Sequence, residues 1–108
     1  MAQYVITFPA RTMILTDEEF EQAGIDANAT IEEMKSAGVY VAAGGINPEN
    51  PVFLVAADGS TSPGPYSDTE GFNGGVTIID VATREEAVEW AAKIAVACRC
   101  PQELRELF

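Results

Sequence analysis

The chain has 108 residues, of which 47% are hydrophobic and 21% are charged, as in a single soluble globular domain spanning residues 1–108. Seventeen acidic residues against six basic ones give a net charge of −11, which disfavours nucleic acid and anionic membrane surfaces as partners. No apolar run approaches the roughly 20 residues of a membrane-spanning helix, so no membrane partner is expected.

The first elements predicted along the chain are a strand and a helix. Residues 3–8 alternate between apolar and other side chains, which indicates a strand. Thr16 followed by Glu19 is typical of a capping box, so a helix should begin directly after Thr16. The helix would have one apolar face, formed by Phe20, Ala23, Ala27, Ile31 and Met34. Gly24 leaves a break in this helix open, and Gly38 is a signal for its C-terminal cap.

Two further strands are predicted before a long loop. Residues 39–43 form the first, and residues 52–57 form the second, which is apolar throughout. We therefore expect both faces of residues 52–57 to be covered. Asp58-Gly59 is a strong hairpin turn signal, after which residues 60–62 could pair back briefly.

The loop from Gly64 to Gly75 leads into a β-branched strand over residues 76–81. A long loop that enters a central strand is a common place for binding residues. Turn chemistry alone also explains most of the residue types in this loop. Asp80 is unusual within the apolar strand, and we interpret it as a strand-end residue near the next helix cap.

A second helix and a last strand complete the chain. Thr83 followed by Glu86 is another capping box, directly after a strand. The apolar face of this helix is predicted to contain Ala87, Val88, Ala91, Ile94, Ala95 and Cys98. Pro101 ends the helical segment, and residues 103–108 indicate a terminal strand.

This order of strands and helices predicts an α+β fold, a ferredoxin-like sandwich with an antiparallel sheet and two helices on one face. The opposite face of the sheet would be apolar and uncovered. A second copy of the chain is the simplest cover, so we expect a homodimer.

The two cysteines, Cys98 and Cys100, are only two residues apart, and the chain has no histidine. This spacing is too short for a relaxed disulfide, and two thiols are too few for a zinc site. We expect reduced thiols that pack, with no metal and no cofactor. The N-terminal stretch lacks the basic region of a signal peptide, and a cytoplasmic location fits both observations.

Three stretches of the sequence resemble the YCII-related family in its DGPF branch. They are residues 64–69 with Gly74-Gly75 and the strand that follows, residues 37–45 and residues 86–91. Together they cover most of the chain from about residue 31 onward, in the family's order and spacing. The resemblance implies a ferredoxin-like fold that pairs into a dimeric α/β barrel.

The sequence also departs from the family pattern. The leading Asp of the DGPF motif falls on Pro63, its Phe on Tyr66, and its Lys-Glu pair on Glu70 and Gly71. Members of the wider family carry a His in the first helix and an Asp after the Trp-containing helix, proposed as a catalytic pair. This chain has no His and no Asp over residues 91–100, so no catalytic residue carries over. The motif residues that are kept, with a structural role, are Gly64, Pro65, Thr69, Gly74 and Gly75.

The residues themselves suggest five ligand-binding candidates: Arg11, Tyr40, Tyr66, Asp68 and Glu70. Without histidine, a general base would have to be a carboxylate with a perturbed pKa, as Asp68 or Glu70 could provide. Both are better explained as solvated turn residues, because Asp is common in turns. Arg11 could bind a ligand carboxylate, or form a surface ion pair. Tyr40 and Tyr66 could form the walls of a cleft.

Two functions remain open from the sequence. One is a small-molecule binder, with or without metal-independent enzymatic activity, that uses a cleft between sheet and helices. The other is a non-catalytic interaction or regulatory accessory module. The resemblance favours the second by association, since some family members are encoded beside sigma factors.

Overall fold

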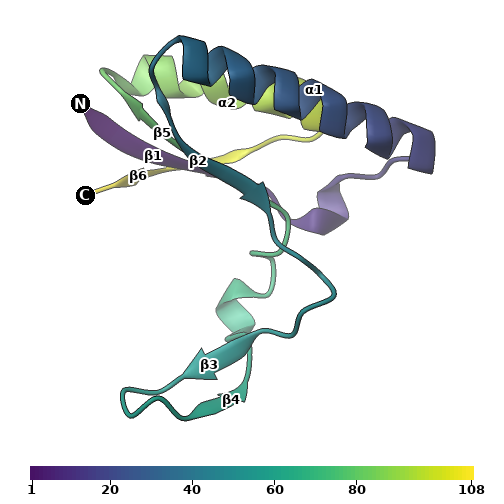
Figure 1. The fold of residues 1–108 in the computed structure, drawn as a ribbon, viewed down its shortest axis with the longest axis vertical. Coiled ribbons are helices and arrows are strands. Elements are labelled where there is room, and N and C mark those ends of the chain that lie inside the picture. Colours follow the sequence, from purple (N-terminus) through teal and green to yellow (C-terminus); the bar gives the residue numbers. More distant parts are fainter.

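A computed structural model describes residues 1–108 of the protein. Four strands form one antiparallel sheet, and two helices pack on one face of it (Figure 1). The strands of this sheet are β1 (Ala2–Thr7), β2 (Tyr40–Gly45), β5 (Gly75–Val81) and β6 (Glu103–Leu107). The helices are α1 (Asp17–Ser36) and α2 (Arg84–Cys98). The α+β class that the sequence predicts is confirmed.

The strands are arranged in the order β2-β5-β1-β6, and every neighbouring pair is antiparallel. Each helix therefore connects two strands that are not neighbours in the sheet. This topology is compatible with the ferredoxin-like sandwich. The sheet of one chain is open at its edge strands β2 and β6 and does not close into a barrel.

The protein contains no helix with the length and apolar character needed to cross a bilayer.

The core lies between the sheet and the two helices. Ile6 of β1, Ile79 of β5 and Met34 of α1 are all fully buried in it. Because successive side chains of a strand point to opposite faces, their neighbours Val5 and Ile78 lie on the other face of the sheet. Val5 and Ile78 are paired across β1 and β5 and are only partly buried. That face carries no helix.

Helix α1 has the ends that the sequence predicts. The Thr16 hydroxyl accepts a hydrogen bond from the backbone N–H of Glu19, and the Glu19 carboxylate accepts one from the backbone N–H of Thr16. Gly38 follows the helix with a φ of +75°, the left-handed conformation that glycine adopts most easily. The helix is continuous through Gly24, so no break occurs. Phe20 is 61% exposed and is not part of the buried face, because the first turn extends beyond the sheet (Figure 1).

The replacement Gly24→Ala is expected to stabilise the protein by about 0.5–1 kcal/mol, because glycine is a poor residue inside a helix. A Cβ atom built at Gly24 meets no atom within 4 Å, so the added methyl group causes no clash. Urea denaturation measures the change in the free energy of unfolding. The matched control is Ala29→Gly at an exposed position of the same helix, which should lower stability by a similar amount. A loss of stability in Gly24→Ala would contradict the open surroundings of this position.

Helix α2 begins and ends as its sequence indicates, with one difference. The Thr83 hydroxyl accepts a hydrogen bond from the backbone N–H of Glu86, but the reciprocal bond of a full capping box is not formed. The helix ends at Arg99, which has a left-handed φ of 57° and forms an ion pair of 3.0 Å with Asp26 of α1. Val88 is exposed, so the predicted apolar face included one residue too many.

Residues 52–57 contain the predicted strand, but the prediction that both faces of this strand are covered is wrong. These residues contribute β3 (Phe53–Val55), which pairs only with β4 (Thr61–Pro63) in a hairpin separate from the main sheet. We call residues 52–64 the arm; it extends away from the sheet and helices (Figure 1). Its exposed apolar side chains are Val52, Phe53 and Val55. The hairpin turn predicted at Asp58-Gly59 is confirmed.

The arm explains the extended shape of the chain. The radius of gyration is 15.0 Å, whereas a compact domain of this length would have about 13 Å. An apolar run of strand length is compatible with a buried central strand or with a strand that packs against something else. The arm is not a buried central strand, because Val52, Phe53 and Val55 remain 49–69% exposed.

Candidate functional site

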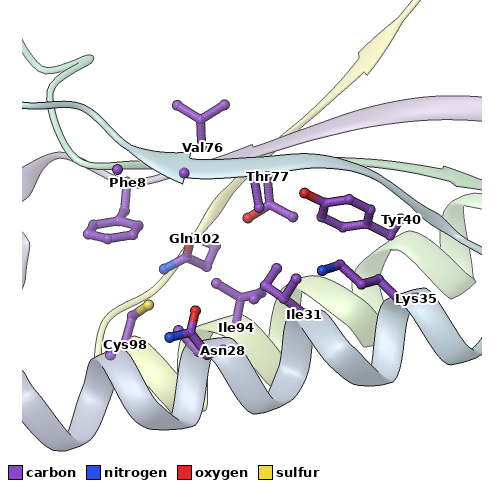
Figure 2. A pocket seen from close by; sticks show the side chains of 16 residues that line it. Phe8, Asn28, Ile31, Lys35, Tyr40, Val76, Thr77, Ile94, Cys98 and Gln102 are labelled. Carbon is purple, nitrogen blue, oxygen red and sulfur yellow. The ribbon is translucent and has the colours of Figure 1, made fainter.

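A cleft with a volume of about 430 Å³ lies between α1 and the sheet (Figure 2). Its apolar walls include Phe8, Ala27, Ile31 and Ile94. Its polar side chains are Asn28, Lys35, Tyr40, Thr77 and Gln102. A hollow of this size, mostly apolar with a few polar groups, has the character of a small-molecule site.

The cleft exists because the sheet lacks side chains where α1 passes over it. β2 ends in Gly44 and Gly45, and β5 begins at Gly75. Gly45 leaves the sheet wall bare at this point, whereas the Phe8 ring occupies the space beside Gly75, where a Cβ atom would lie 2.6 Å from it. A Cβ atom built at Gly44 or Gly45 meets no atom within 4 Å. From α1, Asn28, Ile31 and neighbouring residues face this space across the gap (Figure 2).

Lys35 and Tyr40 form one end of the cleft. The Lys35 ammonium group lies 5.1 Å from the centroid of the Tyr40 ring, within the range of a cation–π contact. Its acidic partner is Glu32, at 3.5 Å, and both side chains are largely exposed. Lys35 is the one charged side chain among the residues that line the cleft. This end of the cleft is therefore lined by a single ammonium group that has one exposed acidic partner.

Gln102 lies toward the other end, near Cys98 (Figure 2). Its Nε2 atom donates a hydrogen bond of 3.1 Å to the backbone oxygen of Cys100. Its Oε1 atom is buried and has no hydrogen-bond partner in the protein. A buried acceptor without a partner is unfavourable, so this atom is suited to receive a donor from a bound molecule.

Both cysteines are free and buried, as the sequence predicts. Burial raises the pKa of the Cys98 thiol to about 11, with a smaller contribution from Cys100. The thiolate is the reactive form, so Cys98 lines the cleft as a protonated, weakly nucleophilic group at neutral pH.

Alkylation of Cys98 with iodoacetamide at pH 8 is expected to be on the order of 100-fold slower than that of a free cysteine, because the raised pKa leaves little thiolate. Peptide mass spectrometry measures the rate at each cysteine separately. Labelling should accelerate as the pH rises toward 11. The same protein unfolded in guanidinium serves as the control, and equal rates in both states would contradict the protection of Cys98.

The structure brings only one of the five predicted ligand-binding residues into the cleft, namely Tyr40. Arg11 is exposed on a single 3-10 turn, and none of the four ion pairs includes it. Tyr66 is exposed at the base of the arm. Asp68 lies in a hollow on the helix-free face of the sheet, and Glu70 lines a separate hollow beside the arm.

The loop motif has a structural explanation at three of its glycines. A Cβ atom at Gly74 would collide with the backbone oxygen of Phe8, so the chain can pass there only without a side chain. At Gly64, a Cβ atom would lie 3.2 Å from a methyl group of Val52. Thr69 holds the turn between them, because its hydroxyl donates to the backbone oxygen of Tyr66. At Gly75, which borders the cleft, a Cβ atom would lie 2.6 Å from the Phe8 ring. Pro65 lines the same hollow as Glu70.

Sequence reasoning missed four polar residues of the cleft: Asn28, Lys35, Thr77 and Gln102. For two of them a signal exists. Asn28, Ile31 and Lys35 recur at three- and four-residue spacing, so they share one face of α1. Thr77 and Gln102 give no such signal, because they meet α1 only through the fold.

No group of three or more His, Cys, Asp or Glu residues is placed to hold a metal ion.

Comparison with known proteins supports the family resemblance and adds no function. Residues 2–99 match the family model of the YCII-related domain, which is most of the chain. No curated protein matches the sequence.

Proposed function

We propose that this chain, which belongs to the YCII-related family, is a homodimeric protein that binds a small molecule in the cleft between α1 and the sheet. The observation that carries the proposal is the cleft itself, with its volume of about 430 Å³ and its mixture of apolar walls and polar ends. Two buried, free thiols suit a reducing compartment such as the cytoplasm.

The chemistry of the cleft favours binding over catalysis. No carboxylate lines it, and the Cys98 thiol stays protonated at neutral pH because burial raises its pKa to about 11. Neither a carboxylate nor a thiolate is therefore available in the cleft as a general base or nucleophile, and Lys35 and Tyr40 are among its remaining side chains of the types that can act in this way. Asp68 and Glu70, the carboxylates that the sequence suggested as bases, lie outside the cleft.

The helix-free face of the sheet supports the homodimer. Val5, Val76 and Ile78 point to this face and are only partly buried within one chain. A contiguous apolar surface of this kind is rarely left to solvent. A second copy, related by a two-fold axis, would cover both open faces at once.

The proposed function is tested with a library of small fragments and a blocked cleft. Fragments added to ¹⁵N-labelled protein should shift backbone NMR signals of residues around the cleft, such as Ile31 and Thr77. Ala43→Trp should abolish these shifts, because Ala43 lines the cleft from an exposed edge strand and a large side chain there fills it. The control is Ala29→Trp, which adds the same bulk on the exposed side of α1. Shifts that persist in Ala43→Trp would contradict the assignment of the site.

One observation favours a second function, that of an interaction module. The arm leaves Phe53, Val55 and Val52 about half exposed or more. Such side chains are suited to contact another protein. If no fragment perturbs the cleft, while truncation of the arm removes binding of a partner protein, this second function would replace the first.

A further inference from the structure

We infer that the cleft takes a small monocarboxylic acid whose body is apolar and whose far end carries a hydrogen-bond donor. This inference rests on the proposed function, since it names the chemical class that the same cleft would bind. It follows from the different chemistry of the two ends of the cleft (Figure 2).

The carboxylate is assigned to the end that holds Lys35 and Tyr40. Lys35 carries the one charge among the lining residues, in a protein whose net charge is −11. The competing ion pair with Glu32 is an exposed pair three residues apart on one helix, a type that contributes little stability. An incoming carboxylate can therefore pair with the ammonium group without breaking a strong contact. The Tyr40 hydroxyl adds a donor that can bond to the same oxygen atoms.

The ligand should carry a single negative charge. One ammonium group balances one carboxylate, and the nearby Glu32 carboxylate would repel a second charge on the ligand. A phosphate, with close to two charges at neutral pH, usually meets several cationic groups or a row of backbone N–H groups. Neither is present at this end of the cleft.

The donor is assigned to the end that holds Gln102. The Oε1 atom of Gln102 is buried and has no partner, while its Nε2 atom is already held by the backbone oxygen of Cys100. This contact distinguishes the two ends of the amide and leaves the acceptor without a partner. Because Oε1 exposes less than 1 Å² in the unliganded protein, a small rotation of the Gln102 side chain has to present it to the ligand. A hydroxyl or amino group of the ligand would satisfy it. An apolar group placed there would leave the acceptor unpaired, which is unfavourable.

The walls between the two ends determine the body of the ligand. Ile31 of α1 and Ile94 of α2 face this space, and Phe8 closes it beside Gln102. Between the ends, Thr77 is the remaining polar side chain on the sheet side (Figure 2). An apolar ring or short chain would bury its surface against these walls.

Three rigid probes separate the two assignments: 4-hydroxybenzoate, 4-hydroxybenzamide and benzoate. Each is titrated into ¹⁵N-labelled protein, and the dissociation constant is read from the signals of cleft residues. We expect 4-hydroxybenzoate to bind at least tenfold more tightly than the amide, because only the acid can pair with Lys35. We expect it to bind about three- to tenfold more tightly than benzoate, because only the phenol can donate to Gln102.

Two variants assign each preference to its residue. Lys35→Met should remove the preference for the acid over the amide, and Gln102→Met should remove the preference for the phenol over benzoate. Lys93→Met is the matched control, because Lys93 is an exposed lysine paired with Glu33 outside the cleft. It should leave both preferences unchanged.

The outcomes distinguish this inference from the proposed function. Equal binding of all three probes in the cleft would overturn the inference and leave the cleft as a binding site. A preference for the acid that survives Lys35→Met would overturn the assignment of the carboxylate. If none of the probes perturbs the cleft at millimolar concentration while other fragments do, the ligand class is wrong. If no fragment binds there at all, both proposals fail together.

Discussion

Replacing Gly74 by alanine is expected to lower the free energy of unfolding by about 3 kcal/mol or more, at the upper end of overpacking effects. The added Cβ atom would collide with the backbone oxygen of Phe8, and it would lie 3.1 Å from the backbone nitrogen of Ala10. Backbone atoms cannot move aside as a flexible side chain can. The collision therefore has to displace the end of β1 or the start of β5.

The surroundings of Gly74 make such a shift expensive. Its carbonyl oxygen accepts a hydrogen bond of 2.9 Å from the backbone N–H of Ile46, and the neighbouring Asn73 side chain accepts one from the N–H of Ala10. Three separate segments of the chain thus meet at this point. Displacing any one of them breaks a hydrogen bond and disturbs the packing of Phe8 in the core.

Thermal denaturation should show the effect of Gly74→Ala as a drop of at least about 12 °C in Tm, since 1 kcal/mol corresponds to about 4–8 °C in a domain of this size. Gly45→Ala is the matched control, because Gly45 lies in the adjoining strand and a Cβ atom there meets nothing within 4 Å. Its stability should stay within about 1 kcal/mol of the wild type. Similar Tm values for the two variants would contradict the close approach at Gly74.

The sequence predicts the elements of the main fold well, because their signals are local. Thr16 with Glu19 marks the start of α1, and Gly38 marks its end, each through hydrogen bonding or backbone conformation within a few residues. The alternation in β1 and the β-branched run in β5 identify the strands for the same reason. Such signals do not depend on which segments meet later.

The surroundings of an element are harder to predict than its type. Residues 52–57 have the composition of a buried central strand, yet β3 is exposed on the arm. The composition indicates that an apolar cover is needed, but it does not identify the segment or the chain that provides it. Phe20 and Val88 are further examples. Each was predicted in the apolar face of a helix, yet each side chain is exposed, because that part of the helix does not face the sheet.

The candidate site was largely missed for a related reason. The long loop is rich in polar and turn-forming residues, and this composition favours it as a binding region. Its candidates Tyr66, Asp68 and Glu70 nevertheless lie outside the cleft. The cleft lies under α1, where Gly45 at the end of β2 leaves the sheet without a side chain. Neither Gly45 nor Gln102 reads as a binding residue until the fold brings them to the same space.

The dimer is the remaining proposal with a large measurable effect, and the helix-free face of the sheet determines its test. Ile78 pairs with Val5 near the middle of this face, between the edge strands β2 and β6. Phe72, from the loop before β5, lies along the same face beside Ile78 and Val76. In a two-fold dimer both chains contribute the same surface to the interface, so a change at Ile78 acts twice.

Ile78→Lys is therefore expected to convert the protein from a dimer to a monomer. Because Ile78 is already partly buried within one chain, the lost apolar contact is the smaller part of the effect. The variant also places one ammonium group from each chain in an apolar interface, and an unpaired buried charge costs several kcal/mol, so the dimer should be weakened by at least about 100-fold. Light scattering at micromolar concentration should give twice the chain mass of 11.5 kDa for the wild type and the single mass for Ile78→Lys.

The control is Val96→Lys, an equally polar change at an exposed position of α2. This variant should stay dimeric, and its far-UV circular dichroism spectrum should be like that of Ile78→Lys. A single mass of 11.5 kDa for the wild type would rule out the homodimer and leave the open face to a different partner.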